Sequence, residues 1–141
     1  MSEKRRPLSI TLIAIRDALS VLAVPFALQH PMMLFGFQFT GVVGQALHLA
    51  SAALCLYLAI GLWGLREHAR KLAIAWEAFV TVNAWVCYPL IRRTAEQIIR
   101  DHGYGGVAPV APMVAGLVGA SVLSLVVIAF LIRRQDVFRD S

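Results

Sequence analysis

Residues 110–132 read VAPMVAGLVGASVLSLVVIAFLI, a run of 23 residues without a charged side chain. An α-helix needs about 20 apolar residues to cross the hydrocarbon core of a bilayer, which is roughly 30 Å thick. The run meets that length, and it lacks the short alternating segments that are typical of a membrane β-barrel. It therefore predicts a transmembrane helix and places the chain among membrane proteins.

Three more apolar blocks of similar length precede this run, at about residues 8–28, 40–65 and 72–91. The chain of 141 residues is 59% hydrophobic and 15% charged, with a mean hydropathy of +0.71. A soluble domain of this length would need far more polar surface. We predict an all-α fold in which residues 1–141 form one transmembrane domain, a bundle of four membrane-spanning helices.

The third predicted helix contains a proline, Pro89, in the segment CYPLIRR. Proline removes a backbone donor and clashes with the carbonyl four residues back. We expect a kink near Pro89, beyond which the helix continues as an interfacial extension to about residue 101.

The basic residues predict the orientation of the bundle. Nine of the thirteen Lys and Arg fall on one side of a four-span topology and three on the other. Lysine and arginine concentrate on the cytoplasmic side, so both termini are expected in the cytoplasm. Because these residues lie at helix ends and not on one stripe, the net charge of +5 does not indicate nucleic acid binding. The nine are Lys4, Arg5, Arg6, Arg66, Arg70, Lys71, Arg133, Arg134 and Arg139, and the three are Arg92, Arg93 and Arg100.

Two charges interrupt the first predicted helix, Arg16 and Asp17 in LIAIRDALSVL. Adjacent helical residues point about 100° apart, so the two cannot be satisfied by facing each other squarely, and each needs a partner on another helix, or water. Asp17 is expected to bond a nearby polar group or the donors that remain on Arg16. Glu77 lies at a depth in its predicted helix that is compatible with that of Arg16, so we predict an Arg16–Glu77 pair. Asn83 completes the predicted intramembrane polar cluster. Such a cluster either fixes helix packing, marks a proton or ion path, or lies at an interface with another subunit.

A second candidate site is His48, which shares one face of its helix with Gln45. Gly44 and Ala52 lie four residues either side and leave room for a haem or chlorophyll bound through His48. No second histidine falls in a predicted span, as bis-histidine haem requires, so a packing histidine is the simpler interpretation. No cofactor, metal site or catalytic residue is predicted, because HExxH, GxSxG and GxxxxGK[ST] are all absent.

Small residues on the last predicted helix indicate close helix packing. Spacings of about one turn let another helix approach the backbone, either inside the bundle or from a second protomer. The residues are Gly116, Gly119, Ala120 and Ser124. The two cysteines, Cys55 and Cys87, differ in depth by roughly 14 Å, beyond the disulfide limit of about 7 Å between Cα atoms, and are expected to be free.

Two segments resemble small four-span membrane proteins of bacteria and archaea. RRPLSITLIAI at residues 5–15 is similar to their opening, R-P-x-G-V-T-I-L-A-I. GLWGLREHARKLAI at residues 61–74 is similar to their joint between second and third helices, G-L-W-x-L-x-x-W-A-R-x-L-A-I. The resemblance implies four spans and no assigned activity, since this family is uncharacterised. The chain departs from it at Arg16-Asp17 and at Glu67-His68.

These observations lead to three functional hypotheses for a multi-pass protein of the bacterial inner membrane. The first is a non-enzymatic accessory or assembly subunit that packs in the lipid against a membrane protein partner or a second copy. The alternative is a small transporter or proton- or ion-conducting oligomer that uses Arg16, Asp17 and Glu77. The third is a haem- or pigment-binding protein that uses His48.

Overall fold

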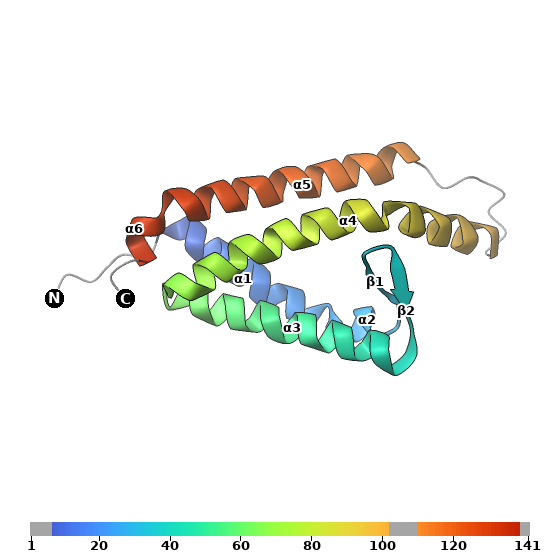
Figure 1. Ribbon diagram of the computed structural model, residues 1–141, viewed down its shortest axis with the longest axis horizontal. Helices are drawn as coiled ribbons and strands as arrows, with labels where there is room; N and C mark the ends of the chain where they lie inside the picture. The colour runs from blue at the N-terminus through green and yellow to red at the C-terminus, as the bar shows by residue number, and fades with distance from the viewer. Residues whose placement is uncertain (1–6, 102–109, 139–141) are drawn as a thin grey trace.

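The computed structural model describes residues 7–101 and 110–138, and this part of the chain is helical apart from one short hairpin. Three of its helices are long and apolar enough to cross a membrane: α3, α4 and α5. A helical fold with three helices that could cross a membrane is therefore confirmed. In chain order the elements are α1 (Leu8–Leu22), α2 (Val24–Ala27), β1 (Met32–Leu34), β2 (Phe37–Phe39), α3 (Gly41–Trp63), α4 (Glu67–Asp101), α5 (Val110–Arg133) and α6 (Gln135–Phe138) (Figure 1).

The first helix differs from its prediction because it is interrupted. α1 ends at Leu22, and the four-residue α2 begins at Val24 after a break at Ala23. Pro25 accounts for the break, since its ring clashes with the carbonyl four residues back and it has no backbone N–H to donate. With 15 residues, α1 alone is shorter than the roughly 20 that a full crossing takes.

The third predicted helix begins five residues earlier than expected. α4 starts at Glu67, whereas the predicted block began at about residue 72. Glu67 in the first turn suits the positive end of the helix, and it pairs with Arg70 one turn later at 2.6 Å. The helix continues through Pro89 to Asp101 as one element of 35 residues.

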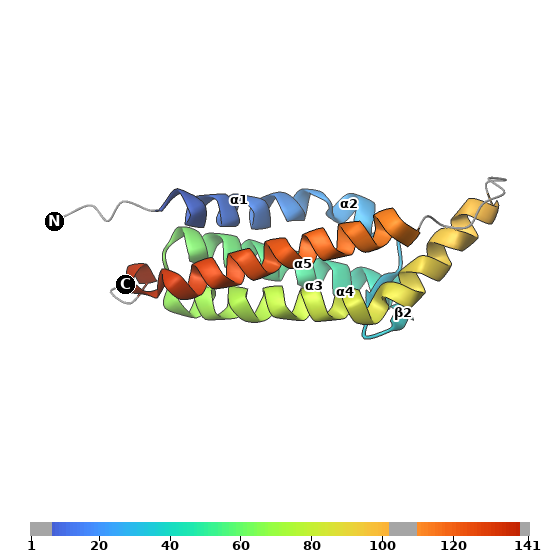
Figure 2. The same cartoon turned by 90° about the horizontal axis from the view of Figure 1, so that it is seen from above.

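The helices pack as two pairs. α1 packs mainly on α3, α4 packs mainly on α5, and α3 joins the pairs by packing on α4. Figure 2 shows α1 and α4 on opposite sides of the molecule, with α3 and α5 between them in this view. The side of the molecule between α1 and the α4–α5 pair is therefore bridged by side chains, not closed by packed backbones.

The hydrophobic core lies at the end of the molecule where α1 begins and α5 ends. Ile10, Leu58, Leu62, Leu131 and Phe138 are fully buried there. The helices approach closely at this end because a small residue faces a small residue. A Cβ placed on Gly61 of α3 would lie 2.4 Å from the Cβ of Ala69 on α4.

Arg70 ties the last turns of the chain to this end. Its Nη1 donates a hydrogen bond to the carbonyl of Leu131 at 3.2 Å, near the C-terminus of α5. Its guanidinium also lies 5.9 Å from the ring centroid of Phe138 in α6. A cation at this position satisfies a carbonyl that the helix itself leaves without a partner.

The opposite end of the molecule carries a hairpin that the sequence did not lead us to predict. β1 and β2 are antiparallel, with Met32 opposite Phe39 and Leu34 opposite Phe37. The two loop residues, Phe35 and Gly36, have φ of 49° and 80°. Positive φ at both positions is the signature of a type I′ turn, but the usual Asn-Gly or Asp-Gly is absent, so the sequence signal is weak.

Candidate functional site

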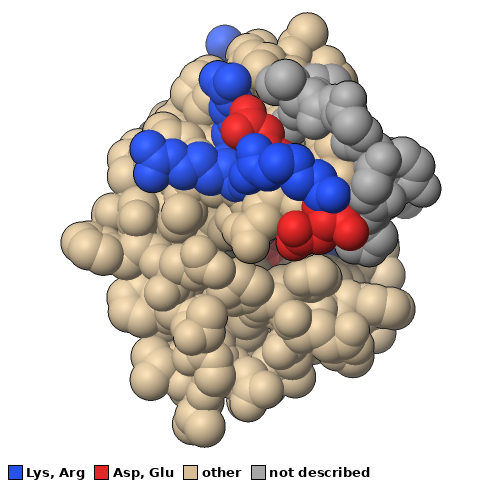
Figure 3. All heavy atoms as spheres, turned by 90° about the vertical axis from the view of Figure 1, so that its right-hand side faces the viewer, with Lys and Arg blue, Asp and Glu red and all other residues tan. Residues whose placement is uncertain are grey.

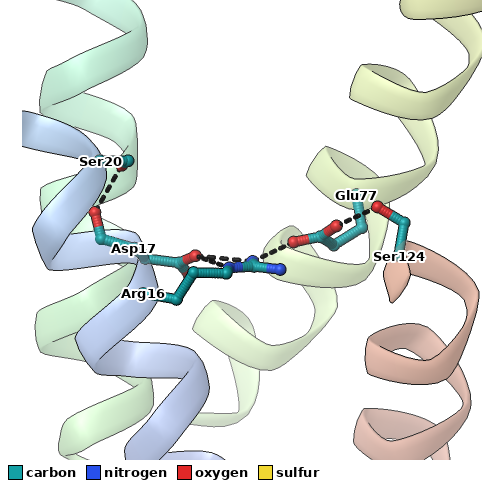
Figure 4. Close-up of polar contacts among 5 residues, drawn as sticks. All are labelled: Arg16, Asp17, Ser20, Glu77 and Ser124. Atoms are coloured by element: carbon teal, nitrogen blue, oxygen red, sulfur yellow. Dashed lines mark hydrogen bonds and ion pairs between the residues drawn. The ribbon is translucent and has the colours of Figure 1, made fainter. Parts of the chain in front are cut away.

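Arg16 stands at the centre of a charged cluster between α1 and α4. Its Nε and Nη2 donate to Oδ1 of Asp17 at 3.0 and 2.7 Å. Nη2 also donates to Oε1 of Glu77 on α4 (Figure 4). The predicted Arg16–Glu77 pair is therefore present, and one guanidinium holds both carboxylates.

Asp17 was expected to bond either a nearby polar group or the donors that remain on Arg16, and the second alternative is confirmed. The Cα–Cβ bonds of the two residues point about 100° apart on the helix. The arginine side chain is long enough to bring its guanidinium to the carboxylate of Asp17 in spite of that angle (Figure 4).

Two serines complete the cluster. Oγ of Ser124 on α5 donates to Oε2 of Glu77 at 2.5 Å. Oγ of Ser20 donates to the backbone carbonyl of Asp17 at 2.6 Å (Figure 4). Glu77 is thus bonded from α1 through one oxygen and from α5 through the other, and the network links three helices.

The charges of the cluster do not balance. It contains one guanidinium, of Arg16, and two carboxylates, of Asp17 and Glu77, and therefore carries one surplus negative charge when all three are ionised. Asp17 and Glu77 are each only 6% exposed, whereas 39% of the Arg16 side chain is exposed. Buried charged groups are energetically costly unless they are paired, hydrated or neutralised.

The cluster borders a cavity of about 290 Å³. Residues from four helices, α1, α3, α4 and α5, form the wall. One part is polar, with the charged cluster and both serines, and the other part is apolar. The residues are Arg16, Asp17, Ser20, Cys55, Trp76, Glu77, Val80, Ala120, Leu123 and Ser124. This cavity is the space into which the exposed part of Arg16 can project.

Asn83 does not belong to this cluster, and our placement of it there is corrected. Its Oδ1 accepts a hydrogen bond from the backbone N–H of Phe35 at 2.8 Å. Its Nδ2 donates to the carbonyl of Met33 at 3.1 Å. Asn83 therefore attaches the hairpin to α4, a role that could not be predicted without the hairpin itself.

His48 and Gln45 lie nearer the hairpin end. Nε2 of His48 is 3.2 Å from the carbonyl oxygen of His30, so this nitrogen is the donor of the bond. A haem or chlorophyll bound through Nε2 would have to displace that bond. Gln45 lines a polar pocket of about 150 Å³ together with His30 and Thr40. Within residues 7–101 and 110–138, no three His, Cys, Asp or Glu side chains gather as metal ligands would.

The small residues of α5 have different surroundings. Ser124 is buried and bonded to Glu77, and Ala120 lines the cavity of the charged cluster. A Cβ built on Gly116 or Gly119 would have no described atom within 4 Å. The part of this face at Gly116 and Gly119 is therefore not covered by other residues that the structure describes.

Sequence reasoning missed two features of the site. It treated Ser124 as a packing residue only, although a hydroxyl on a buried helix face signals a need for a polar partner. It also gave no role to Ser20 or Cys55, which line the cavity. Cys55 and Cys87 are both free, as predicted.

Comparison with known proteins finds no matching family model, no matching curated protein and no matching solved structure.

Proposed function

We propose that the chain is a four-span protein of the bacterial inner membrane with both ends in the cytoplasm. The support for a fourth crossing is that α1 and α2 follow each other over residues 8–27, about 30 Å at 1.5 Å per residue. The start of α1 and the end of α5 lie at the same end of the molecule (Figure 1). Arg66, Arg70 and Lys71 belong to that end, whereas Lys4, Arg5, Arg6 and Arg139 lie outside the described residues.

The same proposal makes the last part of α4 an interfacial extension beyond a kink at Pro89. Its support is that the C-terminal part of α4 departs from the direction of the earlier turns (Figure 2). Arg92, Arg93 and Arg100 lie on this part of the helix, and Arg92 pairs with Glu96 at 2.9 Å. Figure 3 shows basic and acidic side chains side by side on this end of the molecule. Such groups suit the headgroup region.

Within that membrane, we propose that the protein is a non-enzymatic accessory subunit that docks through α5. The observation that carries the proposal is the uncovered face at Gly116 and Gly119. Membrane helices associate by close backbone packing at small residues, since lipid supplies no hydrophobic drive between them. A continuous face of small residues that the described part of the chain leaves uncovered fits a helix from another membrane protein or from a second copy of the chain.

Purification from native membranes in mild detergent tests this docking. We expect the wild-type chain to co-purify with a stoichiometric membrane protein or as an oligomer. Gly119→Leu is expected to abolish the association, because the new side chain separates the two helix backbones. Ala50→Leu, at an exposed position of α3, is the matched control and is expected to retain it. A wild-type chain that purifies as a monomer without a partner would exclude the accessory role.

The charged cluster favours a second candidate function, proton or ion translocation. Intramembrane ionisable residues commonly mark such paths, and this cluster has surplus negative charge beside a cavity. Flux into proteoliposomes tests it. We expect Glu77→Gln to abolish the flux, whereas Glu96→Gln, at the end of α4, is expected to leave it unchanged. Equal flux in protein-free vesicles would exclude this candidate.

A further inference from the structure

The cavity beside the charged cluster adjoins a second cavity along the seam between α1 and α3. The second cavity has a volume of about 190 Å³, and Ser20 and Cys55 line both. Its wall also contains His48 and Ser51, together with small apolar residues of α2 and α3. The two spaces therefore share part of their walls.

A third cavity lies at the hairpin end. It has about 150 Å³, and Gln29, His30, Thr40 and Gln45 are among the residues that line it. His48 links it to the second cavity, since its ring lines that cavity while its Nε2 donates to the carbonyl of His30. Polar side chains thus recur from the hairpin end to the charged cluster.

Toward the start of α1, the seam between α1 and α3 is apolar. Ile10, Ile13, Leu58 and Leu62 are buried there. A further cavity of about 260 Å³ lies on this seam, and no charged side chain is among the residues that line it, which are Ala14, Ile15, Ala18, Leu56, Ala59, Ile60 and Trp63. The polar side chains that line cavities next to the cluster therefore lead toward the hairpin end.

We propose that the three cavities form a water-filled half-path by which protons reach the Asp17–Glu77 pair from the hairpin end. The proposal rests on the second candidate function above. Uptake of one proton from water by either carboxylate cancels the surplus negative charge, so the neutral cluster holds one guanidinium, one carboxylate and one carboxylic acid. In a medium of low dielectric constant, that neutralisation is favoured over an isolated charge.

The groups that face the cluster from each helix agree with this charge count. α1 supplies Arg16 and Asp17, and α4 supplies Glu77. α5 supplies the neutral hydroxyl of Ser124, and α3 supplies Cys55. His48 lies in the wall of the neighbouring cavity, and its Nε2 donates to the carbonyl of His30.

Cys55 is a built-in reporter for water in the half-path. It lines two of the three cavities, and the other cysteine, Cys87, is only 1% exposed. In the full chain with Cys87→Ala, a membrane-impermeant cationic methanethiosulfonate is added to vesicles of either orientation, and modification is read by mass. We expect Cys55 to react when the reagent is on the hairpin side and to be protected when it is on the other side.

A matched pair of variants tests the route itself. Ala52 lies between His48 and Cys55 in the wall of the second cavity, and its neighbour Ala53 is exposed on the outside of α3. Ala52→Phe fills the cavity and is expected to cause loss of labelling, whereas Ala53→Phe is expected to retain it.

Two results would overturn the half-path, and both are read in the chain that carries only Cys87→Ala, so misfolding of a cavity variant cannot obscure them. One is a Cys55 that reacts with a lipid-soluble maleimide but never with the impermeant reagent. The other is equal labelling from both sides. Labelling without proton flux would leave the path in place and exclude transport, whereas flux without labelling would exclude the path alone.

Discussion

Arg16 determines the chemistry of the cluster because a guanidinium offers several donors in one plane. It bonds Asp17 on its own helix and Glu77 on α4 with the same side chain. Loss of the arginine and loss of one carboxylate should therefore have unequal effects. Without Arg16 two carboxylates face each other, whereas without the charge of Glu77 a balanced Arg16–Asp17 pair is left.

For the residues of the cluster, we predict that Arg16→Met lowers the free energy of unfolding more than Glu77→Gln does. The expected loss is about 2–4 kcal/mol for Arg16→Met, since removal of one partner leaves uncompensated buried charge. It is about 1 kcal/mol or less for Glu77→Gln, in line with the modest value of polar contacts between membrane helices. Unfolding in mixed micelles of mild detergent and dodecyl sulfate, followed by circular dichroism, measures both.

Arg92→Met is the control, because its partner Glu96 lies one turn away on the same helix and the pair is partly exposed. We expect a loss of about 0.5 kcal/mol or less there. A larger loss for Glu77→Gln than for Arg16→Met would contradict the charge count on which the cluster is interpreted.

Among the elements, α3 and α4 approach each other closely at Gly61, and glycine permits this approach. Gly61 faces Ala69 across the joint between the two helices, with no room for a methyl group. Gly119 on α5 is the opposite case, since no described atom lies within 4 Å of its Cβ position. The two glycines are therefore a matched pair that differs only in what lies opposite.

We predict that Gly61→Ala destabilises the fold by about 1–3 kcal/mol, because a methyl group added to a filled interface forces the helices apart. Gly119→Ala is expected to cause no loss in the isolated chain, because alanine favours the helix over glycine and meets nothing. The same detergent unfolding measures both. Equal losses in the two variants would mean that the α3–α4 contact is not as close as described.

For the whole molecule, the number of crossings depends on whether α1 and α2 together span the bilayer. α3, α4 and α5 each have the length and hydropathy to cross alone, whereas α1 has 15 residues and a break after it. An even number of crossings places the start of α1 and the end of α5 on the same side. An odd number places them on opposite sides.

We predict an even number. In a chain with Cys55→Ala and Cys87→Ala, single cysteines are placed at Leu8, Gln38 and Gln135, all of them exposed positions. Vesicles of known orientation are then labelled with an impermeant maleimide. We expect Leu8→Cys and Gln135→Cys to react from the cytoplasmic side, as the distribution of basic residues predicts, and Gln38→Cys from the other side. Leu8→Cys and Gln135→Cys on opposite sides would rule out the four-span topology.

The sequence by itself determined the class of fold and most element positions. α3 and α5 begin and end within about two residues of the predicted blocks, because apolar length is read locally and the bilayer imposes it. Two local features were missed: Pro25, which lies inside the first predicted apolar block, and a hairpin without the usual turn residues.

Only the tertiary structure decided which polar groups meet. Glu77 was predicted as the partner of Arg16 from depth alone, but the same reasoning put Asn83 in the cluster, and it binds the hairpin instead. Depth along a helix follows from residue number, whereas the direction that a side chain faces depends on how helices rotate and pack against one another. That rotation is set by contacts between residues far apart in the chain, and no single segment contains it.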